Sequence, residues 1–237
     1  MNGVKGYSIV NLNTVNELIP ENTTIDKKRI KKQAEKTFKR GIDIIGSLVG
    51  IIILIPLTII IYIANLLSKD NGTIFYCQER IGQDGKIFKM YKYRSMVIGA
   101  DEKLEKYLKE NEIAKEEYRQ YKKLKNDPRI TKIGKFLRKT SLDEFPQFIN
   151  VLKNEMSLVG PRPYLPREKE EMGEYYKYII KSKPGLTGFW QIYGRSKVTF
   201  TERLNMDYKY SNNQNLKYDT KLLMKTFVNV IKKEGAL

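Results

Sequence analysis

The sequence predicts an α+β protein that contains one long apolar helix, a small β-hairpin and several amphipathic helices. Residues 41–68 are nearly free of charge, and they exceed the ~20 apolar residues that a helix needs to cross a bilayer. Residues 73–96 place β-branched and aromatic runs on either side of a turn signal, which indicates a hairpin. Residues 129–140 and 217–235 repeat apolar residues at helical spacing among basic ones, which is typical of helices on a membrane surface or on a core.

The composition limits the chemistry that the chain can perform. Among 237 residues there are 44 Lys and Arg against 27 Asp and Glu, so the formal net charge is +17 and a polyanionic partner is expected. Nucleic acid and anionic lipid both qualify. One cysteine, Cys77, and no histidine exclude disulfides within the chain, cysteine-histidine zinc sites and histidine-based triads. Any catalysis must therefore use carboxylates, lysines, arginines and hydroxyls.

We expect three parts along the chain: a flexible N-terminal extension (1–35), a membrane helix (36–68) and a mixed domain (69–237). The extension is polar at first and lacks the short basic start and apolar core of a signal peptide. The second part becomes apolar abruptly at residue 41. The third part holds the candidate site residues.

Two features bear on how the apolar helix meets the membrane. Pro56, near its centre, removes one backbone hydrogen bond and favours a kink. Basic residues precede the helix, and Lys69 and Arg80 follow it, so the positive-inside rule places both ends on the cytoplasmic side. A helix that enters the bilayer, breaks at Pro56 and returns accounts for both the proline and the basic residues. A kinked helix that spans the bilayer also accounts for the proline. The residues alone do not decide between them.

The candidate reaction centre lies between Thr140 and Pro163. The adjacent acids Asp143 and Glu144 open an apolar helical pattern there. Neighbouring carboxylates that lose solvent repel each other, so they need a cation or hydrogen-bond donors. A divalent ion with phosphate would supply both. Arg162 follows between two prolines, which restrict the backbone and lower the entropy cost of presenting its guanidinium to an anion.

The same acids also fit a helix cap. Ser141 followed by Glu144 three residues later forms a capping-box pattern, and acidic residues suit a helix N-terminus. The flanks favour chemistry, because basic residues run through 129–140 and Arg162 follows, and arginines match phosphate oxygens. Capping and catalysis can coexist on one turn.

Three further stretches carry polar or aromatic residues. Lys92 and Arg94, between aromatics on the second hairpin strand, are candidates for phosphate contact. Residues 101–127 are dense in charge and predict a solvated helical arm. Residues 183–196 combine three glycines with Trp190, which suits close backbone approach to a ligand with aromatic stacking, or else a plain glycine-rich hairpin.

These motifs, in this order, resemble the bacterial sugar transferases, the monotopic phosphoglycosyl transferase superfamily that starts glycan assembly on a polyprenyl phosphate carrier. The resemblance covers residue 36 to the C-terminus. The matching motifs are FKRGIDIIGS, QERIGQDGKIFKMYKYRSM, FLRKTSLDEFPQFINVLKNEMSLVGPRP, KPGLTGFWQIYGR and YDTKLL.

The resemblance implies a polyprenyl-phosphate sugar-1-phosphate transferase. Asp143 is then the nucleophile that attacks the β-phosphate of a UDP-sugar and releases UMP, and undecaprenyl phosphate attacks the resulting intermediate. Glu144 is then the ligand of Mg²⁺. The sugar is expected to be glucose or galactose, with an N-acetylated amino sugar as the alternative.

The resemblance also assigns polar positions and a location. Lys92, Arg138 and Arg195 are implied as phosphate clamps, with Asp219 orienting one of them or the metal shell. It favours the re-entrant helix, with interfacial helices and the hairpin around an active site on the cytoplasmic face of the bacterial inner membrane. It implies the inner leaflet as a partner and no nucleic acid. A noncatalytic membrane scaffold remains the alternative of another class, because basic faces and a broken helix would serve it equally.

Overall fold

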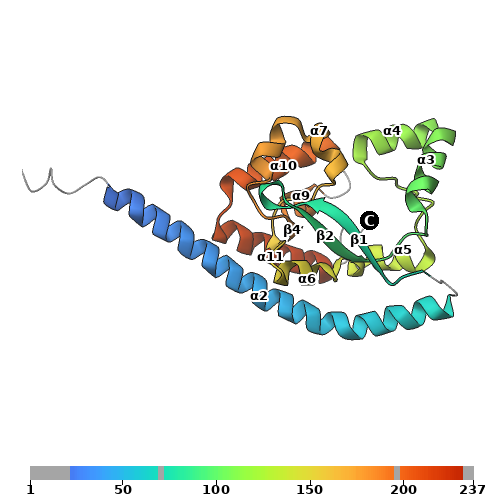
Figure 1. Ribbon diagram of the computed structural model, residues 1–237, viewed down its shortest axis with the longest axis horizontal. Coiled ribbons are helices and arrows are strands. Elements are labelled where there is room, and N and C mark those ends of the chain that lie inside the picture. The colour runs from blue at the N-terminus through green and yellow to red at the C-terminus, as the bar shows by residue number, and fades with distance from the viewer. Residues whose placement is uncertain (1–21, 69–71, 195–197, 232–237) are drawn as a thin grey trace, which may run out of the picture. The chain divides into compact units, whose positions relative to one another are not determined.

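The computed structural model describes residues 22–68, 72–194 and 198–231 (Figure 1). In chain order the elements are α2 (Asn22–Leu67), β1 (Phe75–Ile81), η1 (Gln83–Gly85), β2 (Ile87–Tyr93), α3 (Ala100–Glu110), α4 (Glu112–Tyr121), α5 (Lys132–Lys139), η2 (Leu142–Glu144), α6 (Gln147–Leu152), β3 (Ser157–Val159), η3 (Pro166–Glu168), α7 (Lys169–Met172), η4 (Gly173–Tyr175), α8 (Tyr176–Ile179), β4 (Gly185–Thr187), α9 (Phe189–Tyr193), α10 (Phe200–Asn213) and α11 (Leu216–Ile231). The mixture of helices with two small sheets confirms the α+β class.

Helix α2 belongs to two units, residues 1–39 and residues 40–237. It is helical from Asn22, within the stretch expected to be an N-terminal extension (1–35), and residues 1–21 lie outside the described residues. Residues 22–40 contain neither Gly nor Pro, and good helix formers such as Lys, Gln, Ala and Glu dominate them.

No helix end falls at the predicted break, because α2 continues through Pro56. Figure 1 draws the apolar half of α2 as a curved ribbon. Proline removes one backbone donor, and neighbouring groups can satisfy the carbonyls around it. The hydroxyl of Thr58 donates to the Leu54 carbonyl at 2.7 Å, which is support of this kind.

The start of the apolar half of α2 is fixed to the mixed domain by charged side chains. The guanidinium of Arg40 donates to the carbonyls of Val151 (2.7 Å) and Leu152 (2.8 Å), which satisfies acceptors at the end of α6. Asp43 is buried and accepts a hydrogen bond from the backbone N–H of Leu158 on β3 at 2.8 Å. These contacts anchor α2 on α6 and β3.

The far part of the same helix packs on the hairpin. Leu54 and Ile61 belong to a buried cluster with Tyr93 and Leu137. The Tyr93 hydroxyl lies 2.5 Å from the hydroxyl of Thr58. One side of α2 therefore follows the mixed domain over much of the apolar stretch.

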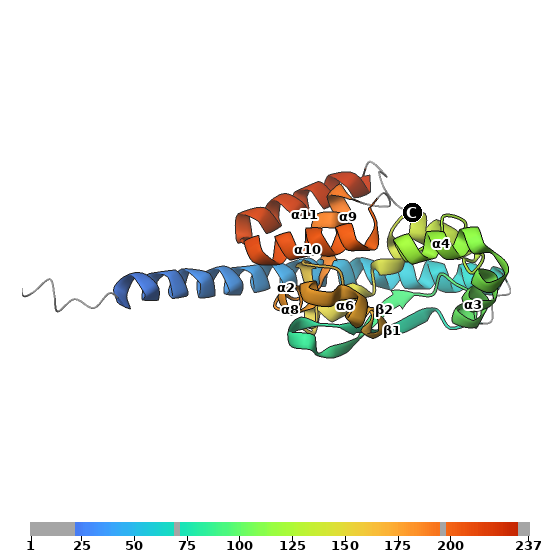
Figure 2. The same cartoon turned by 90° about the horizontal axis from the view of Figure 1, so that it is seen from above.

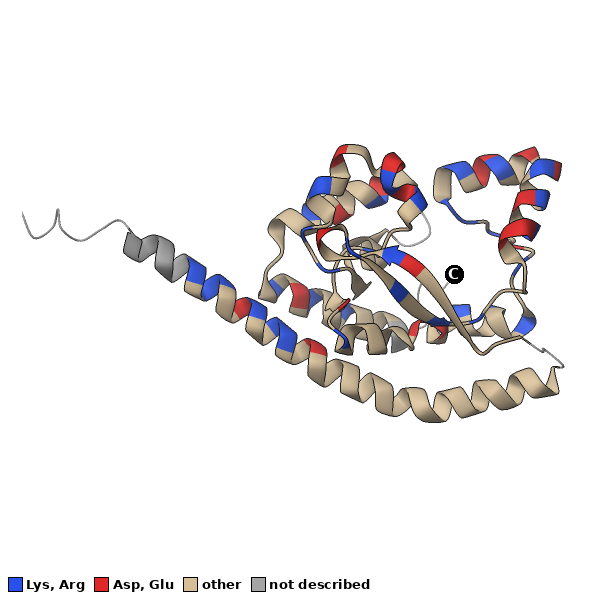
Figure 3. Ribbon diagram, viewed as in Figure 1, with Lys and Arg blue, Asp and Glu red and all other residues tan. Residues whose placement is uncertain are grey.

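The other side of α2 is apolar and exposed. Exposed large hydrophobic residues of this stretch are Ile44, Ile45, Leu48, Val49, Ile52, Ile53, Ile55, Ile59, Ile60, Tyr62, Ile63, Leu66 and Leu67. Figure 3 shows no charged residue along this half of the ribbon. By length and composition, residues Arg29–Leu67 could cross a membrane. A continuous exposed apolar face of this size marks a surface that meets lipid or another protein.

The hairpin prediction is confirmed. β1 and β2 pair antiparallel from Phe75 with Tyr93 to Ile81 with Ile87. The turn between them uses left-handed backbone at Asp84 (φ 57°) and Gly85 (φ 78°), the residue types that tolerate this region. The alternating faces of β2 place Lys92 and Tyr93 on opposite sides. Tyr93 thus packs on α2 while Lys92 faces the site.

The second sheet pairs β3 with β4 in parallel. Two glycines of residues 183–196, Gly185 and Gly188, allow this close pairing, and the described part of the stretch forms no hairpin. A side chain at Gly185 or Gly188 would collide with the backbone of Gly160, and one at Gly160 with the carbonyl of Lys183. The loop that carries Arg162 therefore rests directly on the backbone around β4.

Helices complete the core and the periphery. Helix α9 packs against both α10 and α11, and Ile192, Tyr210 and Leu222 bury there with residues of β2 and β3 (Figure 2). The charge-dense stretch 101–127 forms α3 and α4, with a small core of its own around Leu104. The solvated arm predicted there is confirmed.

Candidate active site

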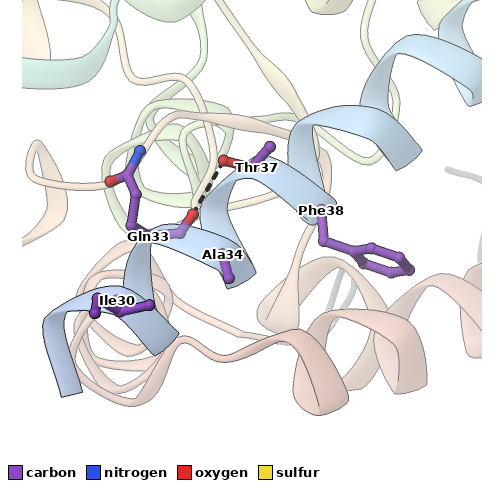
Figure 4. A pocket seen from close by; sticks show the side chains of 5 residues that line it. All are labelled: Ile30, Gln33, Ala34, Thr37 and Phe38. Atoms are coloured by element: carbon purple, nitrogen blue, oxygen red, sulfur yellow. Dashed lines mark hydrogen bonds between the residues drawn. The ribbon is translucent and has the colours of Figure 1, made fainter. Parts of the chain in front are cut away.

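A hollow beside the basic part of α2 does not suit the expected chemistry. It is lined by one helical face (Figure 4), namely Ile30, Gln33, Ala34, Thr37 and Phe38. None of these side chains is charged, and the Thr37 hydroxyl already donates to the Gln33 carbonyl at 3.1 Å. A phosphate-bearing substrate would find no cation among the lining residues.

The two predicted acids lie on η2, the short turn between α5 and α6. Asp143 is 7% exposed. Glu144 accepts a hydrogen bond and ion pair from Lys92, with 2.8 Å between Nζ and Oε1. A cation from the hairpin thus meets the acids from a distant part of the sequence.

The capping box predicted at Ser141 is wrong. Ser141 has left-handed backbone (φ 56°), and its side chain accepts no capping hydrogen bond. Helix α5 ends just before it, so the chain reverses at Ser141 instead of entering a new α-helix. The Glu144 carboxylate is consequently directed to Lys92, and the acids serve the site.

The surroundings give the two acids different proton affinities. Burial raises the pKa of Asp143, and the charge of Lys92 only partly offsets this. Burial also works against ionisation of Glu144, but the charge and the hydrogen bond of Lys92 outweigh it and hold the pKa of Glu144 below its ordinary value. Glu144 is therefore the more firmly ionised acid, and Asp143 is the more basic one.

Arg138 lies beside the acids at the end of α5. Its Nε donates to the Ser95 hydroxyl at 2.9 Å. Burial lowers its pKa, and the charge of Asp143 acts in the opposite direction. The structure thus brings together four predicted residues: Lys92, Arg138, Asp143 and Glu144.

A cavity adjoins Glu144, and we call it the Arg80 pocket. Its lining residues are Arg80, Met90, Lys92, Glu144, Gln147, Arg162, Pro163, Gly185, Leu186 and Gln191. Arg162, in this lining, is the fifth predicted residue that the structure places in or beside the site. Its guanidinium carbon lies 5.5 Å from the centre of the Trp190 ring, and its backbone N–H donates to Asp207 at 3.1 Å. Both contacts fix the loop that presents it.

The sequence did not single out three lining residues: Arg80, Gln147 and Gln191. Arg80 was interpreted as a cation at the membrane end of α2, which is wrong, because it is 6% exposed on β1. Each of the three has a buried polar atom without a hydrogen-bond partner among the described residues. Gln147 could have been suspected from its place three residues after Glu144, on the same turn of chain. Burial of an arginine on a strand leaves no local sequence signal.

Two predicted residues are not placed in this cluster. Arg195 lies outside the described residues. Asp219, on α11, accepts a hydrogen bond from the buried Tyr210 hydroxyl at 2.6 Å and so joins α11 to α10. Arg94, another candidate, donates to the carbonyls of Thr73 (2.6 Å) and Met96 (3.3 Å). These contacts tie Asp219 to α10 and Arg94 to the backbone on either side of the hairpin.

The arrangement suits nucleophilic attack on phosphorus. A buried, comparatively basic carboxylate is a nucleophile, and neighbouring cations can hold phosphate oxygens. The described residues contain no group of three or more acids or cysteines that could hold a metal. Glu144 and the unpartnered buried oxygen of Gln191 nevertheless line one pocket, and Mg²⁺ commonly takes one or two carboxylates with substrate phosphates and water. These residues fit Mg²⁺ bound together with a phosphate.

Comparisons with known proteins show which proteins this chain is similar to. The chain is 44% identical over 207 residues to a UDP-galactose-lipid carrier transferase of Erwinia amylovora and 42% identical over 210 residues to an undecaprenyl-phosphate galactose phosphotransferase of Salmonella typhimurium. These matches cover 87% and 89% of this chain but 43% and 44% of the relatives, so the chain spans less than half of their length.

A relative of similar length also matches. The exopolysaccharide production protein ExoY of Rhizobium meliloti is 40% identical over 198 residues, which is 84% of this chain and 87% of that protein. The sequence pattern described as bacterial sugar transferase matches residues 34–233, which include every element of the site. The chain therefore belongs to the bacterial sugar transferase family.

Proposed function

We propose that the chain transfers a hexose 1-phosphate, glucose or galactose, from a UDP-sugar to undecaprenyl phosphate, with release of UMP. This reaction would start the synthesis of an exopolysaccharide, capsule or glycoconjugate. The observation that carries the proposal is the acid pair Asp143 and Glu144, held beside Lys92 at a pocket lined by arginines. Galactose and undecaprenyl phosphate in the names of relatives support the choice of substrates.

In the first step, a carboxylate oxygen of Asp143 attacks the β-phosphorus of the UDP-sugar. The bond from that phosphorus to the oxygen bridging the two phosphates breaks, and the oxygen leaves with UMP. Burial keeps Asp143 poorly solvated, which favours attack, and Arg138 and Lys92 lie where they can stabilise the charge that develops on the phosphate oxygens. The product is an aspartyl phosphosugar.

In the second step, a phosphate oxygen of the carrier attacks the phosphorus of the aspartyl phosphosugar. The bond to the Asp143 oxygen breaks, so the carboxylate is regenerated and the carrier leaves as a polyprenyl diphosphate sugar. Two transfers on one carboxylate need no histidine, which suits a chain that has none.

Glu144 and Gln191 would hold Mg²⁺ at this site. When bound, the ion would neutralise phosphate charge and help the pyrophosphate bond to break. The ion pair with Lys92 keeps Glu144 ionised and fixes one of its oxygens. Lys92 therefore orients the carboxylate that the metal needs.

We infer further that the chain is monotopic, with residues 36–68 re-entrant and residues 69–237 on the cytoplasmic face of the inner membrane. Asp43 contacts β3, and Ile61, about five helical turns later, packs with Tyr93 of the same domain. A helix that crossed the bilayer would carry Ile61 away from that domain. Epitope tags on both termini should be accessible from the cytoplasmic side, whereas tags on opposite sides would contradict the inference.

The transfer is tested by UMP release from a panel of UDP-sugars with Mg²⁺ and undecaprenyl phosphate in detergent. Wild type, Asp143→Asn and, as a matched control, Asp101→Asn on the exposed arm would be compared. We expect Mg²⁺-dependent release from UDP-glucose or UDP-galactose by wild type and the control, and loss of about a thousandfold or more in Asp143→Asn.

The panel also separates the alternatives. Release from a UDP-N-acetylamino sugar alone would replace the hexose by an amino sugar. Folded, membrane-bound wild type that releases no UMP from any donor would contradict the proposal and favour a noncatalytic scaffold.

A further inference from the structure

Arg80 is a buried arginine whose hydrogen bonds reach only neutral oxygens. Its Nη1 donates to the Pro163 carbonyl at 3.0 Å and its Nη2 to the side-chain oxygen of Gln78 at 2.5 Å. Its Nε is buried and has no partner among the described residues. Burying a cation without a counter-charge is costly, so this arrangement lacks an anion.

The nearest charges make the need for an anion greater. Burial and, after it, the charge of Arg162 lower the pKa of Arg80 to about 10. The charges of Glu168 and Glu144 act on this pKa in the opposite direction. Arg162 lines the same pocket and, among the described residues, has no ion-pair partner. Two guanidiniums that share one pocket repel each other. The one carboxylate among the described residues that line this pocket, Glu144, is already ion-paired with Lys92, so a bound anion would find two cations with donors to spare.

A third donor belongs to the same pocket. The side-chain amide nitrogen of Gln147 is buried, in a residue that is 2% exposed, and has no hydrogen-bond partner among the described residues. Gln147 begins α6, while Arg80 comes from β1 and Arg162 from the loop after β3. Unused donors from three elements that meet beside Glu144 indicate a preformed site.

We propose that Arg80, together with Arg162 and Gln147, forms a subsite that binds phosphate oxygens next to the acid pair. The inference rests on the proposed transfer and adds Arg80 and Gln147 to the residues that contact substrate. Planar guanidiniums bind two phosphate oxygens at once, and the amide donates to a third. The phosphate can belong to the diphosphate of the sugar nucleotide or to the head of the lipid carrier, which have the same chemistry.

The test measures ligand affinity in full-length protein in detergent, without relying on turnover. Kd values for UDP and for short-chain polyprenyl phosphate would be measured by calorimetry for wild type, Arg80→Met and Arg80→Lys. Loss of a charged hydrogen-bond donor predicts a rise of about ten- to a hundredfold in one of these Kd values for Arg80→Met. Arg80→Lys should recover only part of the affinity, because it keeps the charge and loses the fork.

The two ligands identify the source of the phosphate. A weaker Kd for UDP alone assigns the subsite to the nucleotide, and a weaker Kd for the polyprenyl phosphate alone assigns it to the carrier. Unchanged Kd values for both ligands, even with a lower melting temperature, would overturn the proposal and leave Arg80 a structural residue.

Two further variants separate loss of the subsite from loss of folding. Gln147→Leu removes only the amide and should raise the same Kd about tenfold. Arg129→Lys is the matched control, because Arg129 is buried but already paired with Asp127 at 2.7 Å, and it should lower stability without changing either Kd. Failure of the transferase proposal is separate: wild type would release no UMP, while phosphate binding could still be measured.

Discussion

The α3–α4 arm and the Arg80 pocket are both rich in charge, and they satisfy that charge in different ways. On the arm, Lys115 pairs with Glu112 at 2.9 Å and Arg119 with Glu116 at 2.7 Å, each three residues apart on an exposed helix. In the pocket, Arg80 is buried and reaches only neutral oxygens. The charges of the arm are paired locally or exposed to water, whereas the buried Arg80 has no charged hydrogen-bond partner, which is the basis of the proposed phosphate subsite.

The difference shows why charge density alone does not mark a site. Exposed pairs contribute about 0–1 kcal/mol, because water competes for both partners. Buried charges interact more strongly, and leaving one unpaired is costly, so a folded chain keeps such an arrangement where a ligand completes it. The arm contains many more charged residues than the pocket, yet its charges need nothing further.

After the loss of the Asp143 nucleophile, the largest effect is expected at Glu144. Glu144→Gln keeps the shape but removes the negative charge that would hold Mg²⁺, so UMP release should fall roughly a hundredfold or more. The half-saturating Mg²⁺ concentration should rise as well. Glu116→Gln on the arm is the matched control. Equal Mg²⁺ dependence in wild type and Glu144→Gln would contradict the role of Glu144.

Lys92 gives the next largest effect. Lys92→Met removes the partner of Glu144 and leaves two adjacent acids without it, so kcat/KM for UMP release should fall about a hundredfold. Lys115→Met breaks an exposed pair on the arm and should change kcat/KM less than twofold. Equal changes of kcat/KM in Lys92→Met and Lys115→Met would contradict the idea that the pocket pair matters more than the exposed pair on the arm.

Asp207, which accepts a hydrogen bond from the backbone of Arg162, gives a prediction for how stability depends on pH. Burial raises its pKa to about 7, although Tyr164 and the backbone of Arg162 donate to it. The folded-state pKa is above the unfolded value, so as pH rises between about 4 and 7 the unfolded chain releases a proton that the folded chain keeps, and the free energy of unfolding falls.

Asp207→Asn has no carboxyl to titrate and should not show this fall. Relative to wild type, the variant should gain up to about 4 kcal/mol of unfolding free energy between pH 4 and pH 8, measured by urea unfolding in detergent. Parallel stability curves for the two proteins would mean that Asp207 is ionised in the folded state throughout.

The smallest effect is expected on the arm. Arg119→Ala removes an exposed partner of Glu116 and should leave the urea midpoint of unfolding close to that of wild type, because water competes for both partners. UMP release should equal that of wild type. A loss of transfer here would show that the arm contributes to the site.

Local signals explain what the sequence predicted correctly. Asp84 and Gly85 fix the hairpin turn, and the helical spacing of apolar residues predicts α5 and α11. Asp143 and Glu144 were found because two adjacent acids before an apolar run are chemically unusual. Lys92 is a candidate for phosphate contact from its place between aromatics, and the family resemblance supports it and adds Arg138. The structure places both beside the acids.

Long-range contacts explain what the sequence could not predict. Ser141 fits a capping box by residue type, but its left-handed backbone turns the chain away from that geometry. Arg80 follows the apolar helix as an interfacial cation would, yet strand pairing buries it beside Arg162. The glycine-rich stretch lines the pocket through Gly185 and Gln191, and no signal in the sequence shows that Gly185 and Gly188 also admit the backbone around Gly160. Each of these depends on a partner far away in the chain.

The most direct test of the account is the intact mass of the protein after incubation with UDP-galactose or UDP-glucose and Mg²⁺, without carrier. Wild type should gain the mass of one hexose phosphate less one water, located on the peptide that contains Asp143. Undecaprenyl phosphate should remove this added mass. Asp143→Asn should gain no mass. Release of UMP only when donor and carrier are both present, with no added mass on wild type, would contradict the covalent route and assign the reaction to direct transfer.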